Sequence, residues 1–263
     1  WCYKLFIMTS KSIEIILSYV FFFVAAVVGV YFKLNFINFT VLFTVPVIIY
    51  LSLKLKKYFK KLLLEAVVIS VPLEIILDSI AHLSKSWYVP SVWGIRIFGD
   101  MPLDDIIWTF LYILLILLSY TYLFDHYKSK KLKKSFKMMS LTFLILLLGF
   151  IFVNNFFPMI LSVPYFYSIL MAFSLIFTIV FLAKHPKMYQ NISLMALYLF
   201  LPSVFFEYVA LELGHWYFDQ GYHLAYITAG KFSVPFEELL FYFLAVTTTV
   251  LIHEMFGDNN RNT

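Results

Sequence analysis

Cysteine, charge and glycine are all scarce in this chain of 263 residues. The single cysteine, Cys2, cannot form a disulfide within the chain, so a disulfide-stabilised scaffold is excluded. Charged residues make up only 13%, compared with about 25% in an ordinary soluble domain, which excludes a disordered chain or a coiled coil. Hydrophobic residues make up 62% and the mean hydropathy is +0.88. These values indicate an integral membrane protein.

Long apolar stretches account for most of the chain. A helix needs about 20 mostly apolar residues to cross a bilayer. We predict eight such helices, at 13–32, 36–53, 62–83, 104–124, 138–156, 159–183, 188–211 and 236–256. The second contains Pro46 and the third contains ionisable residues, among them Glu74, Asp78 and His82, and both features are unusual within a spanning helix. The predicted fold class is therefore all-α, a polytopic membrane protein.

Basic residues concentrate on one side of this predicted arrangement. With eight spans, both termini and the even-numbered loops share a side, which holds 16 of the 20 lysines and arginines. Because basic residues mark cytoplasmic loops, we expect a protein of the cell membrane with both termini in the cytoplasm. The loops 84–103 and 212–235 then face the opposite side. The basic runs are interpreted as topology signals and contacts with anionic lipids, not as a nucleic-acid site.

One pattern occurs in both halves of the chain. It consists of an acidic residue inside a predicted helix, a Trp-Tyr pair nine residues later, and a Pro-x-acid-acid motif. The first copy contains Asp78, Trp87 and residues 102–105, and the second contains Glu207, Trp216 and residues 235–238. With four spans in each half, both halves enter the membrane in the same direction. We therefore expect two parallel four-helix repeats, 1–125 and 126–263, in one membrane domain, with a site at their interface.

Two pairs of adjacent acids are the main candidates for chemistry. Asp104 and Asp105 begin the fourth span, and Glu237 and Glu238 begin the eighth. A carboxylic acid that stays neutral beside apolar surface can donate a proton, while an ionised partner accepts one. Acids after a proline are also a normal helix start, because negative charge is favourable there. The recurrence of the motif after the same Trp-Tyr loop favours catalysis.

Other polar and aromatic residues have two interpretations each. Glu74, Asp78 and Glu207 lie inside predicted helices, where they either form interhelical hydrogen bonds or contact a substrate. Trp87 and Trp216 are either anchors at the membrane interface or ring faces that stabilise a carbocation.

No cofactor motif is present. The sequence contains no Gly-x-Gly-x-x-Gly, no phosphate-binding loop and no His-Glu-x-x-His. We therefore predict no nucleotide, flavin or other cofactor and no metal site.

Residues 216–256 resemble the carotenoid lycopene cyclase domain. The resemblance rests on Trp216-Tyr217-Phe218-Asp219, on residues 234–243 and on Glu254. This is the integral-membrane, non-flavin family found as bacterial heterodimers, archaeal fused chains and the cyclase half of fungal fusion enzymes. It is built from two related halves, each with Pro-x-Glu-Glu/Asp before an aromatic-rich helix, and the resemblance covers 62–124 and 188–256. The first half departs from the family, because Asp104-Asp105 replaces the usual glutamates and Ile107-Trp108 replaces the common Phe-Phe.

The resemblance implies a redox-neutral isomerisation. A carboxylic acid protonates the terminal double bond of a linear carotenoid, the cation closes a six-membered ring, and a base removes a ring proton. Glu237 or Glu238 is then expected as the acid and Asp104 or Asp105 as the base or stabiliser. The expected substrate contacts are Glu74, Asp78, Glu207, Trp87, Trp216 and Phe241. The implied partners are an apolar polyprene or carotenoid from the bilayer, lipids, and other enzymes of the carotenoid pathway.

Three alternatives remain open from the residues. The chain acts on longer or hydroxylated polyprenoids, or it is a small transporter with a carboxylate relay, or it is an inactive structural subunit. Prolines inside the spans, such as Pro46, Pro72 and Pro202, favour a transporter, whereas acid pairs at span ends favour an enzyme.

Overall fold

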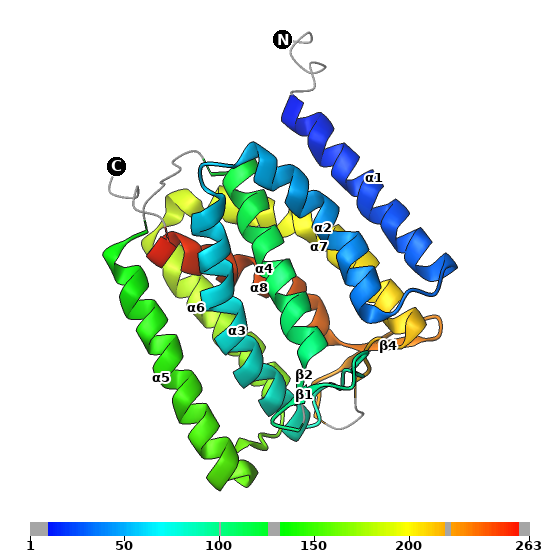
Figure 1. The fold of residues 1–263 in the computed structure, drawn as a ribbon, viewed down its shortest axis with the longest axis vertical. Helices are drawn as coiled ribbons and strands as arrows, with labels where there is room; N and C mark the ends of the chain where they lie inside the picture. Colours follow the sequence, from blue (N-terminus) through cyan, green and yellow to red (C-terminus); the bar gives the residue numbers. More distant parts are fainter. Residues whose placement is uncertain (1–9, 100, 126–131, 219–221, 258–263) are drawn as a thin grey trace.

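A computed structural model describes residues 10–99, 101–125, 132–218 and 222–257 (Figure 1). The described residues form eight long α-helices: α1 (Ser10–Tyr31), α2 (Phe36–Lys54), α3 (Phe59–Leu83), α4 (Leu103–Leu123), α5 (Lys134–Phe156), α6 (Phe166–Lys184), α7 (Tyr189–Leu213) and α8 (Phe236–Ile252). Seven of them are long and apolar enough to cross a membrane. The exception is α3, which carries five charged residues, Lys60, Lys61, Glu65, Glu74 and Asp78. The all-α membrane fold class predicted from the sequence is confirmed.

The ends of the sixth and eighth helices differ from their predicted positions. The prediction began the sixth helix at residue 159, but residues Pro158–Leu161 form a short 3-10 helix and α6 begins only at Phe166. Pro164 lacks an N–H, and Tyr165 has a left-handed backbone (φ 56°), so a continuous helix cannot pass through them. At the other end of the chain, α8 stops at Ile252 and His253–Gly257 continue as a π-helical turn.

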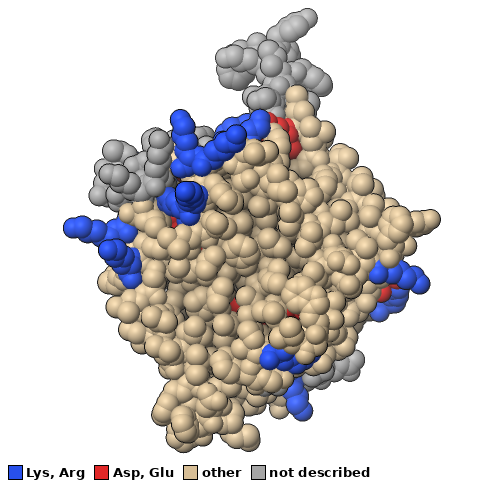
Figure 2. Space-filling model, viewed as in Figure 1, with Lys and Arg blue, Asp and Glu red and all other residues tan. Residues whose placement is uncertain are grey.

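The helices pack in an arrangement that buries α4 most deeply. Helix α4 packs against α2, α3 and α8, and α8 in turn packs against α6 and α7. Helices α1 and α5 lie at the two edges of the molecule and are largely exposed (Figure 1). Figure 2 shows a broad uncharged surface with the basic side chains gathered toward its margins, as expected of a protein whose sides face lipid.

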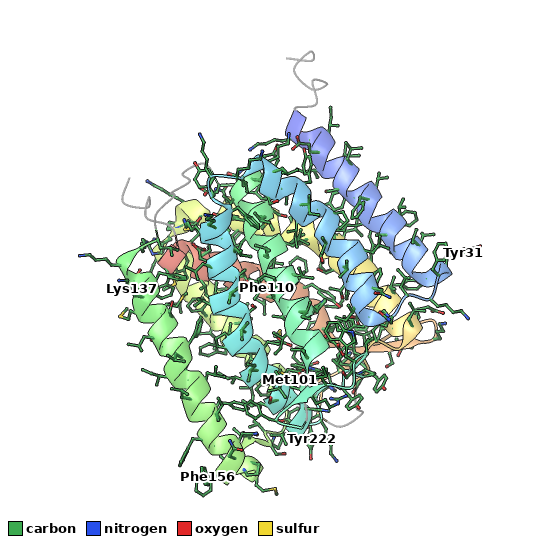
Figure 3. All side chains as sticks on the ribbon, in the orientation of Figure 1. Tyr31, Met101, Phe110, Lys137, Phe156 and Tyr222 are labelled. Carbon is green, nitrogen blue, oxygen red and sulfur yellow. The ribbon has the colours of Figure 1, made fainter. Side chains whose placement is uncertain are left out.

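Two short hairpins occupy the loops that follow α3 and α7. The first pairs β1 (Arg96–Ile97) with β2 (Met101–Pro102), and the second pairs β3 (Tyr226–Ala229) with β4 (Phe232–Pro235). Both lie at the same end of the helices (Figure 1). Met101, which is fully buried, packs beside the start of α4 (Figure 3). Each hairpin therefore leads directly into a helix that begins with an acid pair.

The two Trp-Tyr loops meet through backbone hydrogen bonds. The Tyr88 N–H donates to the Tyr217 carbonyl at 2.9 Å, and the Tyr217 N–H donates to the Tyr88 carbonyl at 3.0 Å. Their rings stack with centroids 5.5 Å apart. Corresponding residues of the two sequence patterns thus pair with each other across the molecule. The boundary between repeats at residues 125 and 126 stays a prediction.

This contact predicts that cysteines introduced at positions 88 and 217 form a disulfide. A hydrogen-bonded antiparallel pair has Cα atoms about 5.5 Å apart, a distance that a disulfide spans without strain. We expect Tyr88→Cys/Tyr217→Cys, made in a Cys2→Ser background, to yield a cross-linked peptide under mild oxidation. Mass spectrometry of the digested protein, with and without reductant, measures it. The control pair Tyr88→Cys/Lys231→Cys should stay unlinked, and equal linkage in both pairs would contradict the contact.

Candidate functional site

A cavity of about 100 Å³ lies between the helices below the paired Trp-Tyr loops. Its walls come from α3, α4, α6, α8 and both loops. The lining residues are Glu74, Leu77, Asp78, Trp87, Val89, Asp105, Trp108, Tyr167, Leu170, Trp216, Phe218, Glu238 and Phe241. Four of these are acids and six are aromatic, while none is lysine, arginine or histidine. A smaller cavity of about 20 Å³ continues from it and shares Trp108, Trp216 and Glu238.

The first acid of each pair accepts a hydrogen bond from the loop that precedes its own helix. Asp104 accepts a hydrogen bond from the Val92 N–H at 2.6 Å. Glu237 accepts one from the Leu224 N–H at 2.9 Å and another from the Ser168 hydroxyl. Neither of these two acids lines the cavity. Asp104 and Glu237 therefore connect the hairpin loops to the starts of α4 and α8.

The second acid of each pair faces the cavity. Asp105 and Glu238 both line it, Asp105 from the start of α4 and Glu238 from the start of α8. Neighbouring residues on a helix point about 100° apart, so only one acid of a pair can face a given cavity. All four acids are catalytic candidates by sequence, and the structure brings Asp105 and Glu238 to the same cavity.

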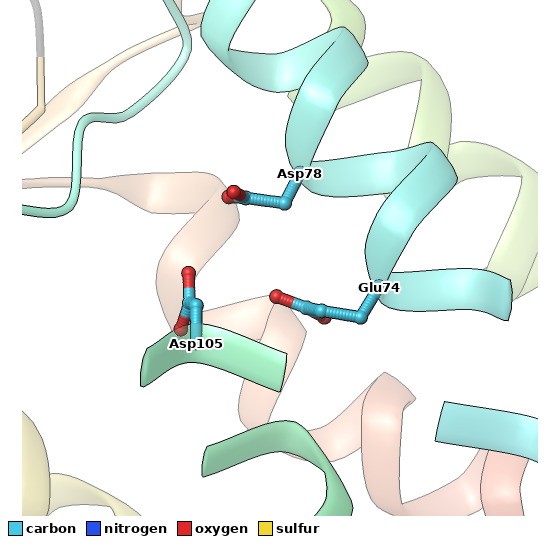
Figure 4. A group of neighbouring side chains, drawn as sticks. All are labelled: Glu74, Asp78 and Asp105. Atoms are coloured by element: carbon cyan, nitrogen blue, oxygen red, sulfur yellow. The ribbon is translucent and has the colours of Figure 1, made fainter. Parts of the chain in front are cut away.

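Three carboxyl groups of the first half lie together in the cavity wall. Glu74 and Asp78 on α3 and Asp105 on α4 carry oxygens that are all within 4.8 Å of one another (Figure 4). Asp78 also accepts a hydrogen bond from the Trp87 indole N–H at 2.6 Å. The oxygens are close enough to hold one metal ion, although clustered acids alone do not define a metal site.

The acids of the second half have hydroxyl partners instead. Glu238 accepts a hydrogen bond from the Tyr167 hydroxyl at 2.5 Å. Glu207 accepts one from the Tyr242 hydroxyl at 2.7 Å and one from the Trp216 indole N–H at 3.1 Å. Glu207 does not line the cavity and lies behind Trp216. The other predicted substrate contacts, Glu74, Asp78, Trp87, Trp216 and Phe241, do line it.

The three hydroxyl partners of the second-half acids were not predicted from the sequence: Tyr167, Ser168 and Tyr242. Tyr242 lies four residues after Glu238, on the same helix face, and this spacing could have identified it. Tyr167 and Ser168 belong to α6, which lies outside the segments 62–124 and 188–256 on which the resemblance was based, so no motif pointed to them. Asp219 of the sequence motif lies outside the described residues.

The aromatic rings around the cavity pack against one another, some edge-on and some face to face. Trp108 stacks on Tyr112 with centroids 5.5 Å apart and meets Trp216 edge-on at 5.8 Å. Trp87 meets Tyr167 edge-on at 4.9 Å. Ring faces of tryptophan and tyrosine attract a cation more strongly once water is removed. The site therefore combines carboxyl groups, which can transfer protons, with aromatic rings, which can stabilise a cation.

Comparison with known proteins identifies the family of this chain. The protein-family model described as lycopene cyclase matches residues 30–123 and 164–256. The matched segments include α2 to α4, α6 to α8 and every acid and aromatic residue of the cavity. Comparisons with curated proteins and with solved structures give no match. Because the family model covers well over half of its residues, the chain belongs to the lycopene cyclase family.

Proposed function

We propose that this protein cyclises the end group of a linear carotenoid such as lycopene by a redox-neutral isomerisation. The observation that carries the proposal is the position of Asp105 and Glu238, which face one aromatic cavity from the two halves of the chain. An acid and a base on either side of an apolar end group are the groups that such a reaction needs.

The proton donor is the cluster around Asp105. Its three carboxyl groups, of which Asp78 and Asp105 are buried, lie within 4.8 Å of one another, and the cavity lining contains no basic residue. Three negative charges at such distances in an apolar site would repel strongly, so the cluster carries protons. Asp105 then protonates the terminal double bond of the substrate, leaving a tertiary cation. This assignment reverses the one expected from the sequence, in which the glutamate pair was the acid.

The base is Glu238. Its carboxylate accepts the Tyr167 hydroxyl, a charge-assisted bond that favours the ionised form of the acid. After the neighbouring double bond attacks the cation and closes the ring, Glu238 takes one ring proton and a double bond re-forms. One proton enters and one leaves, so no oxidant or reductant is consumed. The proton on Glu238 must return to the Asp105 cluster before the next turnover.

Expression in a lycopene-accumulating bacterium tests the proposed function. We expect new pigments with the mass of lycopene and a shortened conjugated system, separated by HPLC and identified by absorption and mass spectra. An empty vector is the control. Unchanged lycopene despite abundant protein in the membrane would contradict the proposal.

Variants of the acid pairs test the assignment of roles. We expect Glu238→Gln and Asp105→Asn to lower cyclisation by at least a hundredfold, because each removes a proton-transfer group. Glu237→Gln and Asp104→Asn are matched controls one residue away, in which the amide oxygen can still accept the loop N–H. They should retain activity within about tenfold. Equal losses at both positions of a pair would contradict the division, once membrane levels of the variants are shown to match.

We also propose that the cavity and hairpins face away from the cytoplasm and that both termini lie inside. The positive-inside distribution of the sequence supports this orientation. In a Cys2→Ser background, Lys231→Cys in the second hairpin should react with a membrane-impermeant maleimide in intact cells. Lys57→Cys, between α2 and α3, should react only after the cells are permeabilised. The opposite labelling pattern would reverse the orientation.

A further inference from the structure

A third cavity, of about 260 Å³, lies at the opposite end of the helices from the hairpins. It is formed by α1, α2, α4 and α7. Its lining is Glu14, Ile15, Leu17, Ser18, Phe21, Pro46, Val47, Tyr50, Leu51, Tyr122, Leu123 and Tyr198. No acid of the candidate active site borders it, so the proposed chemistry gives it no role.

The three cavities lie along one side of α4. Trp108 borders the first and second cavities, Tyr112 and Leu115 border the second, and Tyr122 borders the third. These residues are spaced by four, three and seven positions, so they share one face of the helix. The same succession occurs on α2, where Thr44 borders the second cavity and Val47, about one turn on, borders the third.

On the proposed function, the substrate is a long and narrow chain of which only one end reacts at a time. From Asp105 to Tyr122 there are 17 residues of helix, or about 25 Å. An extended lycopene molecule is roughly as long as the hydrocarbon core of a bilayer is thick, about 30 Å. A substrate whose end group occupies the first cavity and whose chain follows this face of α4 therefore reaches the third cavity.

Polar groups close the far end of this path. The Lys11 ammonium donates to the carbonyls of Tyr122 and Leu123 at 3.2 and 3.3 Å. Lys54 lies 3.9 Å from Glu14. An apolar chain gains nothing by extending past such groups, because they would lose water without gaining hydrogen bonds. The path thus has an acid-lined reacting end and a polar end that sets its length.

We propose that the third cavity binds the unreacted far end of the linear carotenoid and thereby selects substrates by length. This inference rests on the proposed function and adds a second binding site to it. The middle cavity, of about 20 Å³, is the smallest of the three, so the proposal requires the side chains of Phe43 and Leu115 to move aside when the chain enters.

The test fills the third cavity and compares two substrates. Val47→Phe places a ring in the cavity from α2, and Val41→Phe makes the same change on an exposed position of that helix. The substrates are lycopene and diaponeurosporene, a shorter linear carotenoid that carries the same reacting end group. We expect Val47→Phe to lower lycopene cyclisation at least tenfold and diaponeurosporene cyclisation less than twofold, with no change in Val41→Phe. An unchanged ratio of the two activities in Val47→Phe would overturn the proposal.

A second variant covers the case in which Val47→Phe does not fold. Tyr50→Ala enlarges the same cavity from an existing lining residue. We expect it to raise severalfold the relative rate on a linear carotenoid lengthened at its unreactive end. No change in that preference would overturn the proposal.

The amount of pigment that purifies with the protein distinguishes failure of this inference from failure of the proposed function. If the wild-type protein cyclises neither substrate, the proposed function fails, and the amount of lycopene that purifies with the protein decides the inference. Val47→Phe should then retain at least tenfold less lycopene than wild type and Val41→Phe. Equal retention, or a phospholipid as the molecule lost from Val47→Phe, would overturn it.

Discussion

A buried carboxyl group needs hydrogen-bond donors, and the arrangement of this protein's site depends on that requirement. Both the Trp-Tyr loops and the hairpins supply donors to acids on the helices. The Trp87 and Trp216 indoles donate to Asp78 and Glu207, nine residues earlier in each case. Backbone N–H groups of the hairpin loops donate to the first acid of each pair. The recurring sequence pattern is thus a recurring set of bonds that closes each loop over its own helices.

The two halves share this scaffold but differ in what surrounds the acid that faces the cavity. Asp105 is one methylene shorter than Glu238, and two further acids from α3 lie beside it. By the register that aligns Asp78 with Glu207, the counterpart of Glu74 is Ser203, which shares a hydrogen bond with Tyr112 instead. Tyr167 packs edge-on against Trp87, and Phe36 packs edge-on against Trp216 in the corresponding way. Phe36, unlike Tyr167, has no hydroxyl group that could donate a hydrogen bond to an acid. One half therefore groups three carboxyl groups and the other gives its acid a hydroxyl donor, and this difference is what the proposed roles of acid and base rest on.

Much of this architecture follows from the sequence alone. Apolar length predicted the eight helices, and the repeated motif predicted that the acid pairs begin the fourth and eighth of them. The division of labour within each pair could not be predicted, because adjacent residues are chemically equivalent and the rotation of a helix is decided by its neighbours. The role of Tyr167 was inaccessible for a similar reason. A tyrosine in an apolar span carries no local signal, and only the packing of α6 against α8 brings it to Glu238.

The position of the cavity also bears on the choice between an enzyme and a transporter. A carrier must open its site to water on each side in turn. Here the hairpin side is covered by the hydrogen-bonded and stacked Tyr88 and Tyr217. A cover on this side suits a carbocation, because water would capture the cation before the ring could close. A substrate that is itself apolar has no need of an aqueous entrance and can enter between the helices from the bilayer. The Tyr88–Tyr217 contact on the hairpin side therefore favours the proposed cyclisation, whereas a transporter would have to break this contact in each cycle.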